Sequence, residues 1–281
     1  MGEKHLIVVS AENNPYLAWQ SKLFHFSCVS RLEQSPVIVV HETRAAELCQ
    51  DFQKIILVGG RILRAESFKV SANGEPYPAR NTAGTLVCAA REFGASCDSL
   101  VLCDPDMIFV RASPFPETLS GDFCSYIDFD RDFVEAPRAA LNIPRGWVDE
   151  QKESLRCGVP YVIPTSIAGT LGEAWLEAID TFAPRRWEDV MYAFGLAAVK
   201  LRLPVELTHL AQNNFWPAAS VERNIVHYCY GDAIWNKRDY YLPEQAPNVW
   251  RPVVEALGGT VLGEIVSQLR EAEHWYCSHA T

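Results

Sequence analysis

The stretch SLVLCDPDMIFV (residues 99–110) combines a continuous apolar run with two closely spaced carboxylates. An unbroken apolar run of this kind is typical of a strand that is buried on both faces of a sheet. Asp104 and Asp106 follow the run two positions apart, and in extended backbone such side chains point the same way. Pro105 between them disfavours helix at Asp104. The stretch therefore predicts a buried strand that is broken at Pro105 and presents a carboxylate pair.

Short apolar runs alternate with helix-like stretches on the N-terminal side of this strand. Continuous apolar strands alternating with amphipathic helices predict a mostly parallel sheet that is covered on both faces. Gly94 is expected to end the helix that directly precedes residues 99–110. The expected elements are strands at 6–10, 37–41 and 55–60 and helices at 16–32, 43–52 and 82–94.

The pattern changes after residue 110, where turn-rich segments separate the apolar runs. The expected elements are strands at 159–164 and 224–230 and helices at 170–182 and 187–201. No change in composition marks a linker, so we expect a single α/β domain over residues 1–281. Its expected parts are a nucleotide-binding half at about 1–110, an acceptor and metal half at about 111–245, and a C-terminal helical tail at 246–281.

Composition limits the possible partners. The chain has 25 Lys and Arg against 35 Asp and Glu, a net charge of −10, which argues against a nucleic-acid binder because such a protein needs a clustered basic face. None of the nine cysteines forms a C-x-x-C pair, and most lie in apolar runs, as expected of buried thiols in a reducing compartment. With no targeting or transmembrane segment in view, we expect a cytoplasmic protein.

Asp104, Asp106 and His227 together predict a metal site. Two adjacent carboxylates repel each other, and an oxygen-loving divalent cation relieves that repulsion at Asp104 and Asp106. His227 ends a later apolar run, and its imidazole can complete a Mn²⁺ or Mg²⁺ site made otherwise of carboxylate and phosphate oxygens. Lys237 follows ten residues later, where its ammonium would stabilise a leaving diphosphate. A second acidic triplet, Asp128–Asp130, is expected to rim an acceptor site.

Glu188 and Asp189 open the expected helix at 187–201 and allow two interpretations. Acidic residues in the first turn of a helix stabilise its exposed N–H groups. Alternatively, one of the two carboxylates faces a reacting sugar or an acceptor hydroxyl.

In their order along the chain, these motifs resemble those of a metal-dependent glycosyltransferase of the GT-A fold. More narrowly, the chain is similar to the group of hydroxyproline O-arabinosyltransferases and peptidyl serine α-galactosyltransferases, over about residues 5–245. The resemblance implies a Rossmann-like α/β fold, with a mostly parallel central sheet flanked by helices and a mixed acceptor-side half. The motifs that carry it are Tyr16–Gln20, PARNTAG (78–84), DPDMIF (104–109), GVPYVIP (158–164), WEDVMYAFGLAA (187–198), IVHYC (225–229) and WNKRDY (235–240).

The resemblance also implies an activity and residue roles. The donor would be a UDP-sugar, the acceptor a hydroxyl on a glycan, a peptide or a small molecule, and the sugar would keep its anomeric configuration. Asp189, with Glu188 as second choice, would lie beside the sugar. The remaining roles would be metal binding for Asp104, Asp106 and His227, diphosphate contact for Lys237, and nucleotide-sugar binding for Ser10, Ala11, Glu12, Asn13, Arg80 and Asp104.

Two other functions stay open. A non-catalytic, lectin-like subunit that binds a sugar nucleotide could keep the same fold. A sugar nucleotidylyltransferase is less favoured, because it needs a glycine-rich, basic loop after the first strand, and SAENNPY (10–16) contains neither glycine nor a basic residue.

Overall fold

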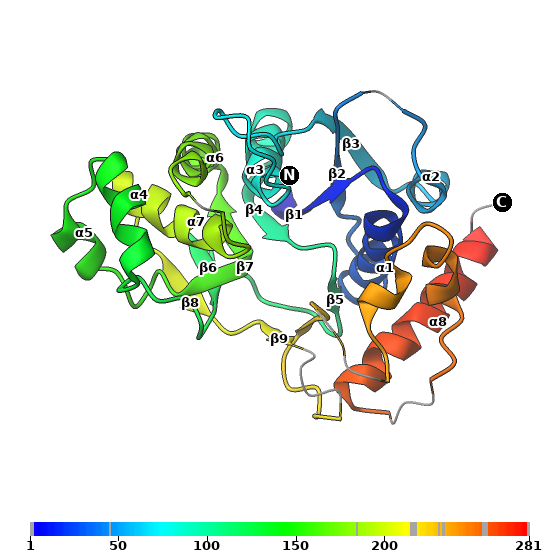
Figure 1. Ribbon diagram of the computed structural model, residues 1–281. Helices are drawn as coiled ribbons and strands as arrows, with labels where there is room; N and C mark the ends of the chain where they lie inside the picture. The colour runs from blue at the N-terminus through cyan, green and yellow to red at the C-terminus, as the bar shows by residue number, and fades with distance from the viewer. Residues whose placement is uncertain are drawn as a thin grey trace. The chain divides into compact units, whose positions relative to one another are not determined.

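The computed structural model describes residues 3–44, 46–183, 185–213, 218–229, 231, 234–254 and 258–279 (Figure 1). The strands are β1 (Glu3–Glu12), β2 (Val37–Glu42), β3 (Arg61–Glu66), β4 (Cys97–Cys103), β5 (Met107–Phe109), β6 (Ser120–Phe123), β7 (Cys157–Pro164), β8 (Glu206–Thr208), β9 (Ala211–Asn213) and β10 (Ile225–His227). The α-helices are α1 (Pro15–Leu32), α2 (Gln50–Leu57), α3 (Arg80–Phe93), α4 (Glu135–Ala140), α5 (Arg145–Asp149), α6 (Thr165–Asp180), α7 (Asp189–Lys200) and α8 (Val261–His279). Three short 3₁₀ helices are η1 (Asp132–Val134), η2 (Lys237–Tyr240) and η3 (Ala246–Trp250).

The strands form a seven-stranded, mostly parallel sheet flanked by helices, which confirms the Rossmann-like α/β expectation at this level. Its order is β3-β2-β1-β4-β7-β6-β8, and β7 is antiparallel to both of its neighbours. A second sheet has three strands in the order β5-β10-β9. The break expected at Pro105 is confirmed, since β4 and β5 belong to different sheets.

The expected helix at 43–52 and strand at 55–60 are wrong. A single helix, α2, covers Gln50–Leu57, and β3 begins only at Arg61. Phe52 and Ile55 are buried, whereas Ile56 and Leu57 are exposed. This one-sided burial at a spacing of three residues is that of an amphipathic helix, so the apolar run was misleading.

The described residues divide into two compact units, each made of three chain segments. Unit 1 comprises Met1–Val8, Glu66–Cys103 and Phe115–His209, and unit 2 comprises Val9–Ala65, Asp104–Pro114 and Leu210–Thr281. The chain halves expected from the sequence stay a prediction.

Unit 1 is held together by aromatic packing and by its helices. Tyr161 of β7 stacks on Phe194 of α7 with ring centroids 4.1 Å apart, and Trp175 of α6 packs edge-on against both rings. The indole N–H of Trp175 also donates to the carbonyl of Val190 at 2.7 Å. These contacts fix α6 and α7 against the sheet strand β7.

In unit 2, α1 is the central element. It packs against α2, α8 and β5 (Figure 1). Two hydrogen bonds hold the backbone of Phe109, because Ser27 Oγ accepts from its N–H at 3.1 Å and Gln268 donates to its carbonyl at 2.8 Å. The short strand β5 is therefore fixed between α1 and α8.

Among the described residues, no helix is both long enough and apolar enough to cross a membrane. The nine cysteines all lie in that part of the chain, and none of them is joined to another by a disulfide there.

Candidate metal centre

Two short strands of unit 2 bring the acidic pair and the histidine together. Asp104 and Asp106 lie in the turn before β5, where Met107 N–H donates to the Asp104 carbonyl at 3.3 Å. Strand β10 pairs antiparallel with β5, and His227 stands opposite Met107. Beyond this pair, Tyr228 N–H donates to the Asp106 carbonyl at 2.9 Å. The strand register therefore places His227 directly beside the acidic turn.

Four side chains form this cluster, which we call the Asp-His-Lys cluster: Asp104, Asp106, His227 and Lys237. His227 Nε2 lies 3.2 Å from Asp106 Oδ1 and 3.9 Å from Asp104 Oδ2. The Lys237 ammonium donates to Asp106 Oδ2. The side chains of Asp106 and Lys237 are 9% and 12% exposed, whereas that of Asp104 is 34% exposed. The cluster is thus shielded at Asp106 and open to solvent at Asp104.

The charges of the cluster depend on one another. Partial burial of Asp104, about a third of whose side chain stays exposed, is the first cause that raises its pKa to about 6, and the charge of Asp106 is the second. Burial also opposes ionisation of Asp106, but Lys237 and His227 outweigh it and hold the pKa of Asp106 well below its usual value. In turn, Asp106 raises the pKa values of His227 and Lys237 against the effect of burial. Asp106 is therefore ionised, and Asp104 is the carboxylate that most lacks a compensating cation.

The cluster fits a divalent cation. One ligand atom each from Asp104, Asp106 and His227 can be chosen so that all three lie within 4.8 Å of one another. Two carboxylates and an imidazole suit Mg²⁺ and Mn²⁺, which take oxygen ligands and tolerate a nitrogen. An imidazole binds a metal in its neutral form, and with His227 neutral, Lys237 supplies only one positive charge to two carboxylates. The ligand set then keeps a negative charge for a cation to balance.

Aromatic side chains pack against the cluster. They lie in the motifs at Tyr16–Gln20 and IVHYC (225–229), but the sequence patterns did not indicate that they support the metal site. Tyr228 is fully buried, donates to the Pro105 carbonyl at 3.3 Å, and stacks on Trp19 with centroids 6.0 Å apart. Tyr16 packs edge-on against Trp19. Burial raises the pKa of Tyr16, and the charge of Lys237 opposes that rise. The available signal was the placement of Tyr16 and Trp19 one helical turn apart, with Tyr228 directly after His227.

The segment expected to hold a nucleotide lies in unit 2, at the end of β1. Ala11 is buried, and Ser10, Glu12 and Asn13 are partly exposed. The Asn13 side chain is already engaged, because its amide donates to the carbonyl of Glu47 at 3.0 Å and its oxygen accepts from Cys49 N–H at 3.0 Å. Asn13 thus ties β1 to the chain before α2, and nucleotide binding by this segment stays a prediction.

Arg80 lies in unit 1 and has a structural partner. Its guanidinium makes a bidentate ion pair with Asp180, both bonds at 3.0 Å, and donates to the carbonyl of Phe68 at 2.9 Å. This pair joins the start of α3 to the end of α6. Arg80 is therefore not a free cation in this conformation, and its expected role near a donor stays a prediction.

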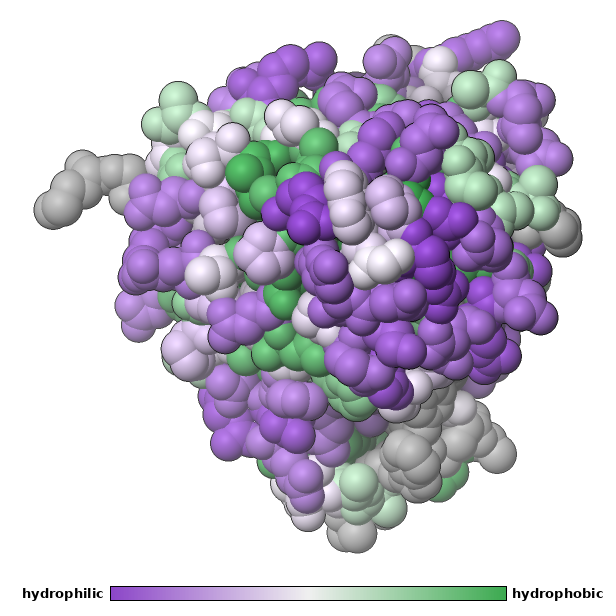
Figure 2. Space-filling model, turned by 90° about the vertical axis from the view of Figure 1, so that its left-hand side faces the viewer, coloured by the Kyte–Doolittle hydropathy of each residue, from purple (hydrophilic) through white to green (hydrophobic). Residues whose placement is uncertain are grey.

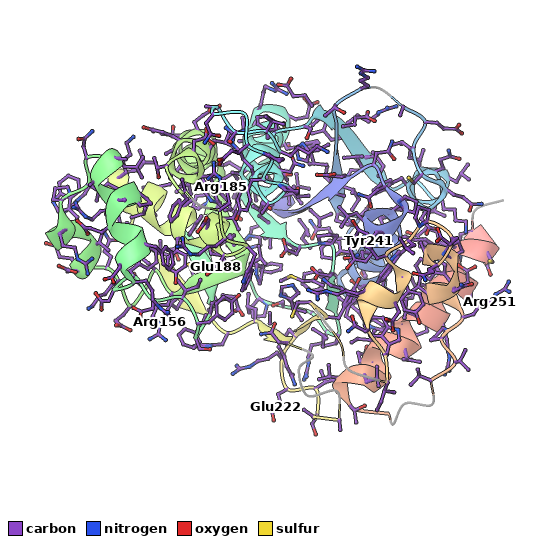
Figure 3. The ribbon with its side chains drawn as sticks, viewed as in Figure 1. Arg156, Arg185, Glu188, Glu222, Tyr241 and Arg251 are labelled. Carbon is purple, nitrogen blue, oxygen red and sulfur yellow. The ribbon has the colours of Figure 1, made fainter. Side chains whose placement is uncertain are left out.

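Glu188 and Asp189 also lie in unit 1, at the start of α7. Asp189 is fully buried, and its Oδ2 accepts from the backbone N–H of Arg186 at 2.7 Å. Burial raises the pKa of Asp189. Glu188 is partly exposed (Figure 3). In this conformation Asp189 holds the backbone before α7, and Glu188 is the member of the pair that solvent can reach. The expected position of either carboxylate beside a sugar stays a prediction.

Comparisons with known proteins add nothing to this description: no family model matches the chain, and a search of curated proteins gives no significant match.

Proposed function

We propose that this chain is a metal-dependent glycosyltransferase of the GT-A fold that transfers a sugar from a UDP-sugar to a hydroxyl acceptor with retention of anomeric configuration. The observation that carries the proposal is the Asp-His-Lys cluster at the turn between β4 and β5. Here three separate chain segments contribute a D-x-D pair, an imidazole and an ammonium. The imidazole and the ammonium each lie within 4 Å of a carboxylate of the pair. An open, negatively charged ligand set beside a lysine is suited to a nucleoside diphosphate carried with a cation.

Asp104, Asp106 and His227 would hold Mn²⁺ or Mg²⁺. When bound, the ion would supply positive charge beside the diphosphate leaving group. Lys237, which donates to Asp106, would place a hydrogen-bond donor and a second positive charge at the same position. Because Asp104 is the most exposed member, we expect it to face the nucleotide, while Asp106 is oriented by His227 and Lys237.

The test is release of UDP from UDP-sugars by the full-length chain, with Mn²⁺ and with EDTA. A panel of UDP-sugars without acceptor is sufficient at first, because slow hydrolysis of the donor reports on the active site. We expect hydrolysis that depends on Mn²⁺ and is lost in Asp106→Asn. The matched control is Asp98→Asn, which changes an exposed aspartate of β4 outside the cluster.

Two results would contradict the proposal. One is full hydrolysis in EDTA, and the other is an Asp106→Asn variant with normal rates. Binding of UDP with Mn²⁺ but no hydrolysis of any donor, even with acceptors present, would instead identify the non-catalytic sugar-nucleotide-binding subunit. Once an acceptor is found, NMR of the anomeric proton tests retention, since a product of opposite configuration to the donor refutes it.

A further inference from the structure

Unit 1 contains a pocket whose wall includes Asp128 and Asp130, the acidic residues that the sequence led us to expect at the rim of an acceptor site. Its volume is about 300 Å³, and it lies at the loop that connects β6 to η1. This volume is at the lower end of the range for small-molecule sites, about 300–1,000 Å³. Its charged lining residues are Asp128, Asp130, Glu153, Arg131, Lys152 and Arg156.

The charges of the pocket balance, since it has three acidic and three basic side chains. Several of them pair with each other or with a neighbour. Asp130 accepts from Lys152 at 2.6 Å and from Arg145 at 2.7 Å, and Arg156 lies 3.3 Å from Glu153. An anion in the pocket would be repelled by three carboxylates, and a cation would be repelled by three basic groups. The lining therefore favours a neutral ligand that both donates and accepts hydrogen bonds.

Two exposed aromatic rings adjoin the pocket. Tyr126 lines it, and the ring of Trp187 lies with its centroid 5.4 Å from that of Tyr126. The two residues are 46% and 61% exposed, although large aromatic side chains usually bury most of their surface. On the face of the molecule shown in Figure 2, hydrophilic side chains predominate and hydrophobic ones form small separate groups. Next to the pair, the pocket itself is lined mainly by charged and polar side chains, so no apolar surface continues there.

The aromatic pair and the pocket wall are held in place. Arg156, visible in Figure 3, donates to the carbonyls of Ile127 at 3.1 Å and Ser125 at 3.0 Å, which fixes the loop on both sides of Tyr126. Tyr77 donates to the carbonyl of Trp187 at 3.1 Å. These contacts hold the surface in one arrangement before a ligand binds. Binding would therefore cost little conformational entropy.

We propose that this surface, the Tyr126–Trp187 pair together with its pocket, binds a neutral saccharide. A pyranose ring has an apolar C–H face, which packs on an exposed aromatic ring, and a rim of hydroxyls that donate and accept hydrogen bonds. The aromatic pair matches the first feature, and the paired carboxylates and guanidinium groups match the second. The assignment deepens the proposed function, because it gives a chemical class to the acceptor rim expected at Asp128 and Asp130. It is argued independently of the Asp-His-Lys cluster, to which none of these residues belongs.

The test is calorimetric titration of the full-length chain with three neutral probes, cellotriose, maltotriose and xylotriose, in the absence of metal and nucleotide. We expect at least one to bind with a Kd of about 1 mM or lower. Trp187→Ala and Tyr126→Ala should each weaken that binding by about tenfold. The matched control is Trp147→Ala, which removes another partly exposed tryptophan of unit 1 that stacks on Arg202 and does not line the pocket. Equal melting temperatures of the variants establish that they fold.

Three outcomes would overturn the assignment: no binding of any of the three probes, equal loss in Trp147→Ala, or binding of inorganic phosphate or a proline-rich peptide in their place. Binding of UDP with Mn²⁺, measured on the same samples, reports the proposed function separately. Failure of either assignment can therefore be recognised without the other.

Discussion

Lys237 competes with a metal ion for Asp106, and its removal should therefore tighten the binding of Mn²⁺ alone. Asp106 has its Oδ1 beside His227 and its Oδ2 bonded to the Lys237 ammonium. An incoming cation must displace or approach that ammonium. Lys237→Met keeps much of the side-chain volume, frees Oδ2 and leaves the ligand set more negative.

The magnitude follows from the contact that is lost. A hydrogen bond to a charged group contributes about 1.5–3 kcal/mol, and 1.4 kcal/mol corresponds to a factor of ten. We therefore expect Lys237→Met to lower the Kd for Mn²⁺, without nucleotide, by about 10- to 100-fold. The same variant should lower kcat for donor hydrolysis more than it raises the donor KM, because the lysine acts on the leaving diphosphate.

The assay is calorimetric titration of Mn²⁺ into both proteins. Arg238→Met is the matched control, since it removes the same charge from the neighbouring, exposed position. A general effect of net charge would tighten binding equally in both variants. Unchanged or weaker Mn²⁺ binding in Lys237→Met would refute the competition, and with it the view that Asp106 is a metal ligand.

Stability provides three further tests. Burial lowers the pKa of His25 from 6.5 to about 4. The free energy of unfolding should therefore be fully retained above pH 6.5 and fall by about 3 kcal/mol as the pH drops to 4. Urea titrations across this range should show a flatter decline for His25→Gln. Lys22 is fully buried, donates to Glu273 at 2.9 Å and lies 3.7 Å from the ring centroid of Trp250. Lys22→Ala should therefore lower the free energy of unfolding by about 3 kcal/mol. A loss under 1 kcal/mol in urea unfolding would contradict this. Arg80→Lys keeps the charge but not the bidentate pair with Asp180, and should lower the free energy of unfolding by about 1 kcal/mol; an unchanged urea midpoint would exclude a structural role for the pair.

Short sequence patterns predicted those parts of the fold that are determined by residues close together in the sequence. The buried strand at 99–103 and the break at Pro105 follow from hydrophobicity and from the restricted backbone of proline, and both are confirmed. The grouping of Asp104, Asp106 and His227 was predicted from their ligand chemistry together with the family resemblance, and the structure brings the three side chains together. The run at 55–60 was misread because composition does not reveal which side of an element is buried.

Other features depend on contacts between distant residues, which a single sequence does not specify. Arg80 and Asp180 are 100 positions apart, and nothing in either neighbourhood indicates the pair. The burial of Asp189 results from the packing of α7 within unit 1, whereas an acidic residue in the first helical turn is usually exposed. The bond between Lys237 and Asp106 likewise required the fold of unit 2.

The pairing of β5 with β10 limits how this chain can change during evolution. Side chains alternate between the two faces of a strand, so one residue inserted between Asn224 and Val226 would turn the imidazole away from the acidic turn and bring Val226 into its place. Insertions after Tyr228, in contrast, leave the register intact. Homologues should therefore keep a constant spacing from Ile225 to His227, and should vary in length between Tyr228 and Asn236, provided that a lysine still reaches Asp106.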